Sequence, residues 1–128
     1  MKAYHGYRVQ QLGNDGQVIS RHCVVRVIID GYADYLLPPR NEIGNHSPDG
    51  FEWGYGGSGP AQLALALVAD CWGGEYAVPK VYQRVKRHVA KLPHDGWTLT
   101  NAEVDAWIAE AVKEIGFTPE VFENPYLE

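Results

Sequence analysis

The arrangement of apolar residues near the start of the chain is typical of β-structure. Residues 4–12, 18–30 and 32–39 are three segments that favour strands, and the middle one carries a dense run of Val and Ile over 24–29. The turn residues Asn14-Asp15-Gly16 separate the first two segments, and the third must stop at Pro38-Pro39. The pattern predicts a small antiparallel sheet of about three strands.

The apolar period changes to a helical one after residue 57. A segment that starts at Ser58 or Gly59 is apolar on nearly every side until Gly73-Gly74, which predicts a buried central helix. A second helix is predicted from Pro79 to Leu92, with one apolar side: Val78, Val81, Tyr82, Val85 and Val89.

The third helix is predicted after Thr100, which forms a capping box with Glu103, and it ends at Gly116. Its inner stripe consists of Val104, Trp107, Ile108, Ala111 and Ile115.

These elements predict one α+β domain, in which a small N-terminal antiparallel sheet packs against three helices. A chain of 128 residues is long enough for one domain with a real core. Its expected parts are a β-rich part (1–40), a loop rich in glycine and aromatic residues (41–57), three helices (58–116) and an acidic tail (117–128), which we expect to be extended over the surface.

Composition excludes several classes of function. The net charge of −5 argues against general nucleic-acid binding, which needs a basic surface, and leaves open a basic protein partner. No segment has the roughly 20 apolar residues of a membrane span, and the start does not resemble a signal peptide, so we expect a cytoplasmic protein. Cys23 and Cys71 are expected to be free thiols; no metal-ligand spacing is present, and we expect no metal and no cofactor.

A glycine-rich loop runs directly into the first helix, in the sequence "FEWGYGGSGP" over residues 51–60. The first N–H groups of a helix have no intrahelical acceptor and carry partial positive charge. Gly56, Gly57 and Gly59 let an anion approach such donors closely, and Ser58 can add a hydroxyl donor or cap the helix. This segment predicts a site for a phosphate or a carboxylate.

The aromatic residues of the same loop extend that prediction. Trp53 and Tyr55 are candidates for stacking a base, an interaction worth roughly 1–3 kcal/mol per base. The alternative is that the glycines only allow close packing and the aromatic rings fill the core. The segment has neither the Gly-Lys-Ser/Thr phosphate loop nor the dinucleotide fingerprint.

The second helix carries an unusual number of basic residues for an acidic protein: Lys80, Arg84, Lys86, Arg87, His88 and Lys91. Arg84 and Arg87 are the better phosphate candidates, because guanidinium groups bind oxyanions bidentately. The alternative is a solvated face that pairs with Glu103 or Glu110.

The loop that precedes the glycines carries candidates for catalysis and binding. His46, Asp49 and Glu52 are close in sequence to Ser58, a set that can serve acid–base or nucleophilic catalysis. The alternative is that Asn45 and its neighbours only shape turns. We predict Asn45 and His46 as ligand-binding residues and assign no catalytic residue.

The segments "NHSP" (45–48), "FEWGYGGSGP" (51–60) and "GW" (96–97) carry a family resemblance. Over roughly residues 36–110 the chain resembles an uncharacterised family of small bacterial and phage proteins. The resemblance implies membership without a mechanism, and its phage setting implies that counter-defence roles are worth considering.

Three functions stay open at this point. The preferred one is a small-ligand binding protein that holds a phosphate-bearing nucleotide at the Gly56–Gly59 turn and, as a counter-defence protein, sequesters an immune signal. The second is an acidic inhibitor that docks on a basic effector of the host, and the third is a small hydrolase that uses His46. We also expect self-association.

Overall fold

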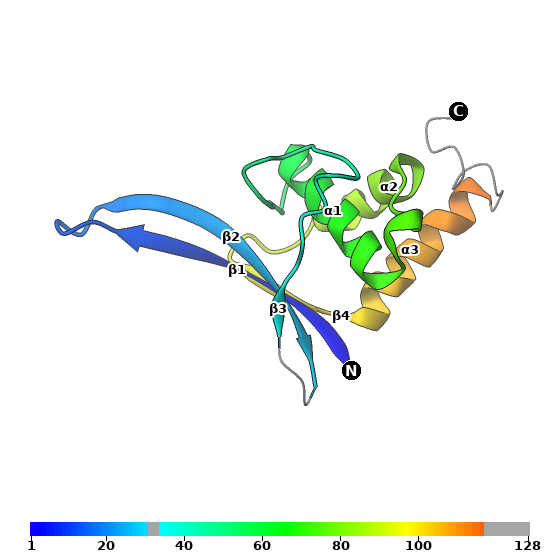
Figure 1. The fold of residues 1–128 in the computed structure, drawn as a ribbon, viewed down its shortest axis with the longest axis horizontal. Coiled ribbons are helices and arrows are strands. Elements are labelled where there is room, and N and C mark those ends of the chain that lie inside the picture. The colour runs from blue at the N-terminus through cyan, green and yellow to red at the C-terminus, as the bar shows by residue number, and fades with distance from the viewer. Residues whose placement is uncertain (31–33, 117–128) are drawn as a thin grey trace.

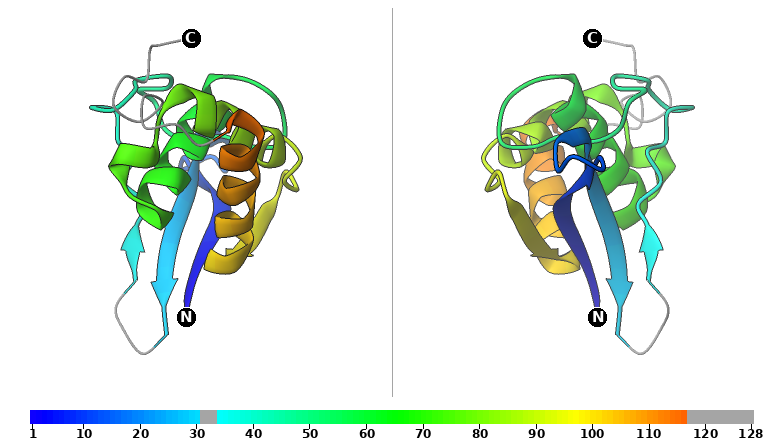
Figure 2. Two further views of the ribbon diagram at one scale, coloured as in Figure 1. Left: turned by 90° about the vertical axis from the view of Figure 1, so that its right-hand side faces the viewer. Right: turned by 90° about the vertical axis from the view of Figure 1, so that its left-hand side faces the viewer.

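Two long strands, β1 (Lys2–Leu12) and β2 (Val18–Ile29), form the centre of the sheet in a computed structural model that describes residues 1–30 and 34–116. The strand β3 (Tyr35–Leu36) pairs with β2, and β4 (Gly96–Thr100) pairs with β1. The order is β3-β2-β1-β4 with every pair antiparallel, as Figure 2 shows from two sides.

The predicted sheet is confirmed, with two differences. The third strand is only two residues long, and a fourth strand lies inside the region that we assigned to helices alone. β4 comes between two helices and spans five residues, too few for a period to be recognised. It becomes a strand because β1, far away in sequence, offers a free edge.

Three α-helices follow, as predicted. α1 (Ser58–Cys71) is buried along most of its length, and α2 (Pro79–Val89) buries the predicted valine side. A short 3₁₀ helix, η1 (Gly74–Tyr76), connects them. α3 (Asn101–Ile115) starts with the predicted capping box, in which the Glu103 amide donates to the Thr100 hydroxyl. The predicted tail, residues 117–128, lies outside the described residues.

The core lies between the sheet and the helices. Burial alternates along the strands, so one face of the sheet packs against the helices and the other faces outward. The strand residues of the core are Tyr4, Val25, Val27, Trp97 and Leu99. The central helix contributes Leu63, Leu65, Leu67 and Val68, which confirms the prediction that α1 is the buried helix.

Asp70, near the end of α1, joins that helix to the sheet. Its carboxylate accepts hydrogen bonds from the hydroxyls of Tyr4 and Tyr35, both at 2.8 Å, and pairs with the Lys2 ammonium at 2.5 Å. Burial and the Asp70 carboxylate raise the pKa of Tyr4, and they raise the pKa of Tyr35 to about 12. Both hydroxyls stay protonated donors at neutral pH.

β1 and β2 extend past the helical part of the molecule as a two-stranded ribbon (Figure 1). β4 accompanies β1 only from Ala3 to Tyr7. The end of the ribbon exposes apolar side chains, with Leu12 58% and Ile19 62% exposed. In the part of the chain that the structure describes, no helix is long and apolar enough to cross a membrane.

Candidate functional site

His46 lies at a cavity of about 360 Å³ between the loop over residues 43–46 and the start of α2. Its Nε2 is 2.7 Å from the hydroxyl of Tyr82, a buried residue of α2, and the two rings meet edge to face. The cavity is lined by Ile43, Gly44, Asn45, His46, Gly74, Glu75, Ala77, Val78, Pro79 and Tyr82. An apolar wall with a few converging polar groups is the usual composition of a small-molecule site.

The buried Gln62 of α1 fixes the loop that carries His46. Its Oε1 accepts hydrogen bonds from the amides of His46 (2.8 Å) and Ser47 (3.2 Å), and its Nε2 donates to the Pro39 carbonyl (2.5 Å). Gln62 is 0% exposed, so these bonds replace all contact of its amide with water. Gln62 thus holds in place the loop that lines the cavity.

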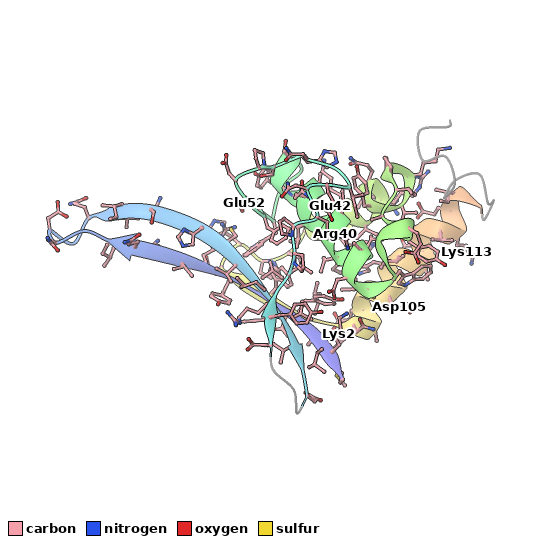
Figure 3. The ribbon with its side chains drawn as sticks, in the orientation of Figure 1. Lys2, Arg40, Glu42, Glu52, Asp105 and Lys113 are labelled. Carbon is pink, nitrogen blue, oxygen red and sulfur yellow. The ribbon has the colours of Figure 1, made fainter. Side chains whose placement is uncertain are left out.

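The same loop places charged side chains near the cavity. Arg40 and Glu42, which are labelled in Figure 3, belong to the segment that follows β3, and their ion pair is 2.5 Å long. A Cβ atom at Gly74, which lines the cavity, would lie 2.9 Å from Arg40 Nη2, so Arg40 comes close to the cavity wall. Arg40 also adopts a φ of 58°, an unfavourable value for a residue with a side chain.

The glycine-rich loop is shaped largely by close packing. Gly54 has a φ of 85°, and its amide donates to the Val89 carbonyl at the end of α2 (3.2 Å). A Cβ atom at Gly59 would lie 2.5 Å from Glu52 Cβ, so only glycine fits there. Gly57 is the N-cap of α1, which has no side-chain cap, and a Cβ atom there would meet the Tyr55 ring at 2.7 Å.

The structure corrects the predicted role of Trp53. Its side chain is 1% exposed, its Nε1 donates to the His94 carbonyl (3.0 Å), and its ring meets Trp97 edge to face. The Arg8 guanidinium covers the ring at 4.8 Å from its centroid. Trp53 is a core residue with no open face for a base; the alternative interpretation, that this aromatic ring fills the core, holds for it. Tyr55, in contrast, is 51% exposed.

Gly56 and the basic side of α2 do come together. An open hollow of about 310 Å³ is lined by Gly56, Gln83, Lys86, Arg87 and Ala90. Nothing would lie within 4 Å of a Cβ atom at Gly56, so its backbone is accessible from the hollow. Ser58, which is two residues after Gly56 and begins α1, is also exposed. The glycine loop thus meets one cationic helix, as the sequence indicated.

The two candidate arginines are engaged with α3. Arg84 Nε pairs with Glu114 at 3.3 Å, and Arg87 Nη2 pairs with Glu114 at 2.8 Å and with Glu110 at 3.3 Å. Hydrogen bonding to Glu114 raises the pKa of Arg87, while the same contact lowers the pKa of Glu114. The predicted alternative, pairing with Glu110, is present. Only Arg87 also lines the hollow.

The cavity at His46 and the hollow at Gly56 follow one side of α2. Pro79 and Tyr82 line the first, and Gln83, Lys86 and Ala90 line the second. These positions recur at intervals of three and four, which places them on one helical face, over a length of roughly 16 Å. We call this the α2 face. It faces the loop over residues 43–57.

The remaining catalytic candidates, Asp49, Glu52 and Ser58, do not line the cavity at His46. Glu52 binds Arg8 through two hydrogen bonds of 3.0 and 3.1 Å, on the ribbon side of the molecule. Asp49 and Ser58 are exposed. Within residues 1–30 and 34–116 no three His, Cys, Asp or Glu side chains are arranged to hold a metal ion.

The two cysteines are free and half-buried in this structure, as expected. Burial is the main factor that raises the pKa of Cys23 and of Cys71 to about 11. Both thiols are therefore protonated at neutral pH and are poor nucleophiles.

The sequence did not single out Gln62, Tyr82 or Glu75 as site residues. Gln62 had a signal, because it is a polar residue inside the Ala- and Leu-rich run of the helix, and a buried amide needs partners. Tyr82 was assigned to the apolar side of the second helix, where its ring does lie. Only the fold shows its hydroxyl beside His46.

Comparisons with known proteins define the family. No curated protein and no solved structure matches the chain significantly. One family matches residues 4–110, which is most of the chain and includes both loops that border the α2 face. The chain belongs to this family, the family of unknown function DUF6166.

Proposed function

We propose that the chain is a small-ligand binding protein and that a phosphate-bearing nucleotide lies along the α2 face. The observation that carries this proposal is the position of two openings on one side of a helix. The cavity at His46 has hydrogen-bonding and aromatic groups. The hollow at Gly56 has an exposed glycine backbone and two cationic side chains. We place this activity in the cytoplasm, as the sequence predicts.

The base would occupy the cavity at His46. His46, Asn45 and the Tyr82 hydroxyl offer donors and acceptors there, and Val78 and Pro79 offer an apolar wall. Because Gln62 holds the loop in place, little ordering is needed when the ligand binds. Of the two predicted stacking residues, Tyr55 keeps an exposed ring, but it precedes Gly56 and does not line this cavity, so stacking on it is not part of the proposed base site.

The phosphate would lie in the hollow at Gly56. The Lys86 ammonium and the Arg87 guanidinium are on one side, and the exposed backbone ahead of α1 is on the other. Arg87 is half exposed, so its ion pairs with α3 are surface pairs that a phosphate can replace at little cost. Arg84 is left out of the proposed site, since it points to Glu114 and does not line the hollow.

Calorimetric titration with linear and cyclic nucleotides, nucleosides and inorganic phosphate tests the proposal. At least one nucleotide should bind, and its nucleoside should bind more weakly. Lys86→Ala should weaken binding at least tenfold, whereas Lys91→Ala, which removes an exposed cation in the turn after the same helix and outside both openings, should change it less than twofold. No heat with any nucleotide would refute the proposal and leave the inhibitor of a host effector as the better hypothesis.

A small hydrolase is the second candidate, favoured by the 2.7 Å contact of His46 with Tyr82 and by Glu75 in the same cavity. An imidazole beside a phenol, in a cavity that a carboxylate also lines, can transfer protons. If the chain is an enzyme, incubation with a nucleotide that binds should yield product, and His46→Ala should abolish the product while binding persists at reduced affinity through the phosphate hollow. Binding without product leaves sequestration of the nucleotide, the counter-defence use that the phage resemblance implied.

A further inference from the structure

The ribbon of β1 and β2 has one edge that the rest of the fold leaves uncovered. β4 pairs with β1 from Ala3 to Tyr7, whereas β1 continues to Leu12. Among the described residues, no strand pairs with β1 on that side beyond Tyr7. We call residues 8–12 on this side the ribbon edge. Its outer part, residues 9–12, has the sequence Val-Gln-Gln-Leu. It therefore lacks the proline or charged residue that usually protects an edge strand from pairing with another chain.

The direction of the backbone groups on this edge follows from the ladder. The Asp30 amide donates to the Met1 carbonyl at 3.0 Å, so Met1 bonds toward β2. Bonding alternates along an antiparallel strand, so odd-numbered residues of β1 bond to β2 and even-numbered residues point the other way. Gln10 and Leu12 therefore direct their N–H and C=O groups out of the ribbon edge.

The end of the ribbon exposes apolar side chains. Leu12 pairs with Val18 across the ribbon, and Ile19 is the extra residue of the adjacent irregularity in register. Their side chains are 58%, 38% and 62% exposed, respectively. A two-stranded ribbon is only marginally stable on its own in water. Further strands beside it would both pair its backbone and cover these side chains.

We propose that two copies of the chain associate antiparallel through their ribbon edges, about a two-fold axis at Gln11. In this register Gln10 of each copy faces Leu12 of the other, and each of the two pairs exchanges two backbone hydrogen bonds. The result is a four-stranded sheet in which the apolar ends adjoin. This association is independent of the ligand proposed above.

Charge favours a second copy in this register. It brings the turn with Asp15 to the base of the other ribbon, where a cleft of about 360 Å³ is lined by Arg8, Gln10, Arg21, His22, Cys23, Glu52 and His94. Two arginines and one glutamate give that lining a charge of +1, opposite to Asp15. Asp95, beside the cleft, is engaged with His94 Nδ1 at 3.0 Å.

The other edge of the ribbon is a poorer choice. The Leu37 amide donates to the Val25 carbonyl at 2.9 Å, so β2 directs Val25, and by alternation Cys23 and Arg21, away from β1. Arg21 is the midpoint of the free segment over residues 18–24. Two copies paired there would place Arg21 against Arg21, and directly opposed like charges destabilise a sheet.

A disulfide cross-link tests the register. Residues on the two-fold axis have Cα atoms about 4.5 Å apart, within disulfide reach, so Gln11→Cys should form a covalent dimer under mild oxidation. Ser20→Cys, the partner of Gln11 across the ribbon but on its other edge, is the matched control and should remain monomeric in denaturing gels. Cys23 and Cys71, protonated at neutral pH, supply little background. Equal cross-linking of both variants would refute the register.

Sedimentation equilibrium tests the association itself. Gln10→Pro removes an outward donor and no bond to β2, so it should raise the dimer dissociation constant at least tenfold. Arg21→Pro removes the equivalent donor on the opposite edge together with one positive charge of the cleft, so it should raise the constant clearly less than Gln10→Pro does. Circular dichroism checks that both variants fold; should a proline unfold the ribbon, Leu12→Arg replaces it. The proposal would be overturned by a wild-type chain that stays monomeric at about 1 mM, or by an equal loss of dimer affinity in the two proline variants.

Discussion

The two loops that border the α2 face are held by different physical means. The loop with His46 depends on one buried side chain, Gln62, which satisfies two amides and a carbonyl. The glycine-rich loop depends on missing side chains, because Gly59 packs against Glu52 and Gly54 bonds to the end of α2. The comparison teaches that a conspicuous glycine run can be mostly packing, while a single inconspicuous glutamine shapes the cavity.

Removing the glutamine should have the largest effect. Gln62→Leu keeps the size of the side chain but leaves two amides and one carbonyl buried without a partner, so the free energy of unfolding should fall by about 3–5 kcal/mol. Urea denaturation measures this loss. Gln83→Leu, an exposed position on α2, is the control and should stay within about 0.5 kcal/mol of the wild type. A loss below about 1 kcal/mol for Gln62→Leu would mean that water reaches the loop.

A methyl group in the second loop should have the next largest effect. Gly59→Ala places a Cβ atom 2.5 Å from Glu52 Cβ and 3.1 Å from the Glu52 amide nitrogen, so we expect a loss of about 1–3 kcal/mol despite the better helix propensity of alanine. Gly56→Ala, in open space, should change stability by less than about 0.5 kcal/mol. Equal effects in thermal or urea unfolding would contradict the packing account.

Removing the contact between His46 and Tyr82 should lower the free energy of unfolding less than either substitution above. Tyr82→Phe removes the hydroxyl that lies 2.7 Å from His46 Nε2, and the expected loss is about 1 kcal/mol, typical of one hydrogen bond. Tyr55→Phe removes a hydroxyl from a half-exposed ring and should be near neutral. Two unfolding curves that coincide would show that the hydroxyl does not stabilise the loop.

The smallest effect concerns Glu52, which joins the second loop to the ribbon. Burial raises its pKa, but hydrogen bonds from Arg8 and from the Trp53 amide outweigh burial, so the pKa is lowered overall. A lowered pKa adds stability above the unfolded value of about 4.3, and that stability disappears as the pH falls through the lower folded value.

Glu52→Gln should therefore flatten the acid limb of the stability curve below about pH 4.3, by less than about 1 kcal/mol because the side chain is 36% exposed. Urea midpoints between pH 3 and 7 measure this slope. Asp49→Asn, on the same loop and exposed, is the control and should leave the slope unchanged. If Glu52→Gln loses as much stability in acid as the wild type, other carboxylates must cause the loss of stability at low pH.

Much of the fold could be predicted from the sequence. The branched run at 24–29, the capping box at Thr100 and Glu103, and the valine side of α2 all mark structure through local geometry. The site was predicted less completely. The segments with Asn45, His46 and Gly56 do border openings, but Trp53 and Gly59 belong to the packing, and Arg84 is engaged with α3.

By itself, the sequence determined the helices, the long strands and the turns, because the period of apolar residues records which backbone geometry can bury them. Only the tertiary structure decided that β4 joins β1, that Gln62 reaches the His46 loop and that Trp53 turns inward. These outcomes depend on partners distant in the chain, whose fit is set by the packing of the whole core. No local pattern encodes that fit.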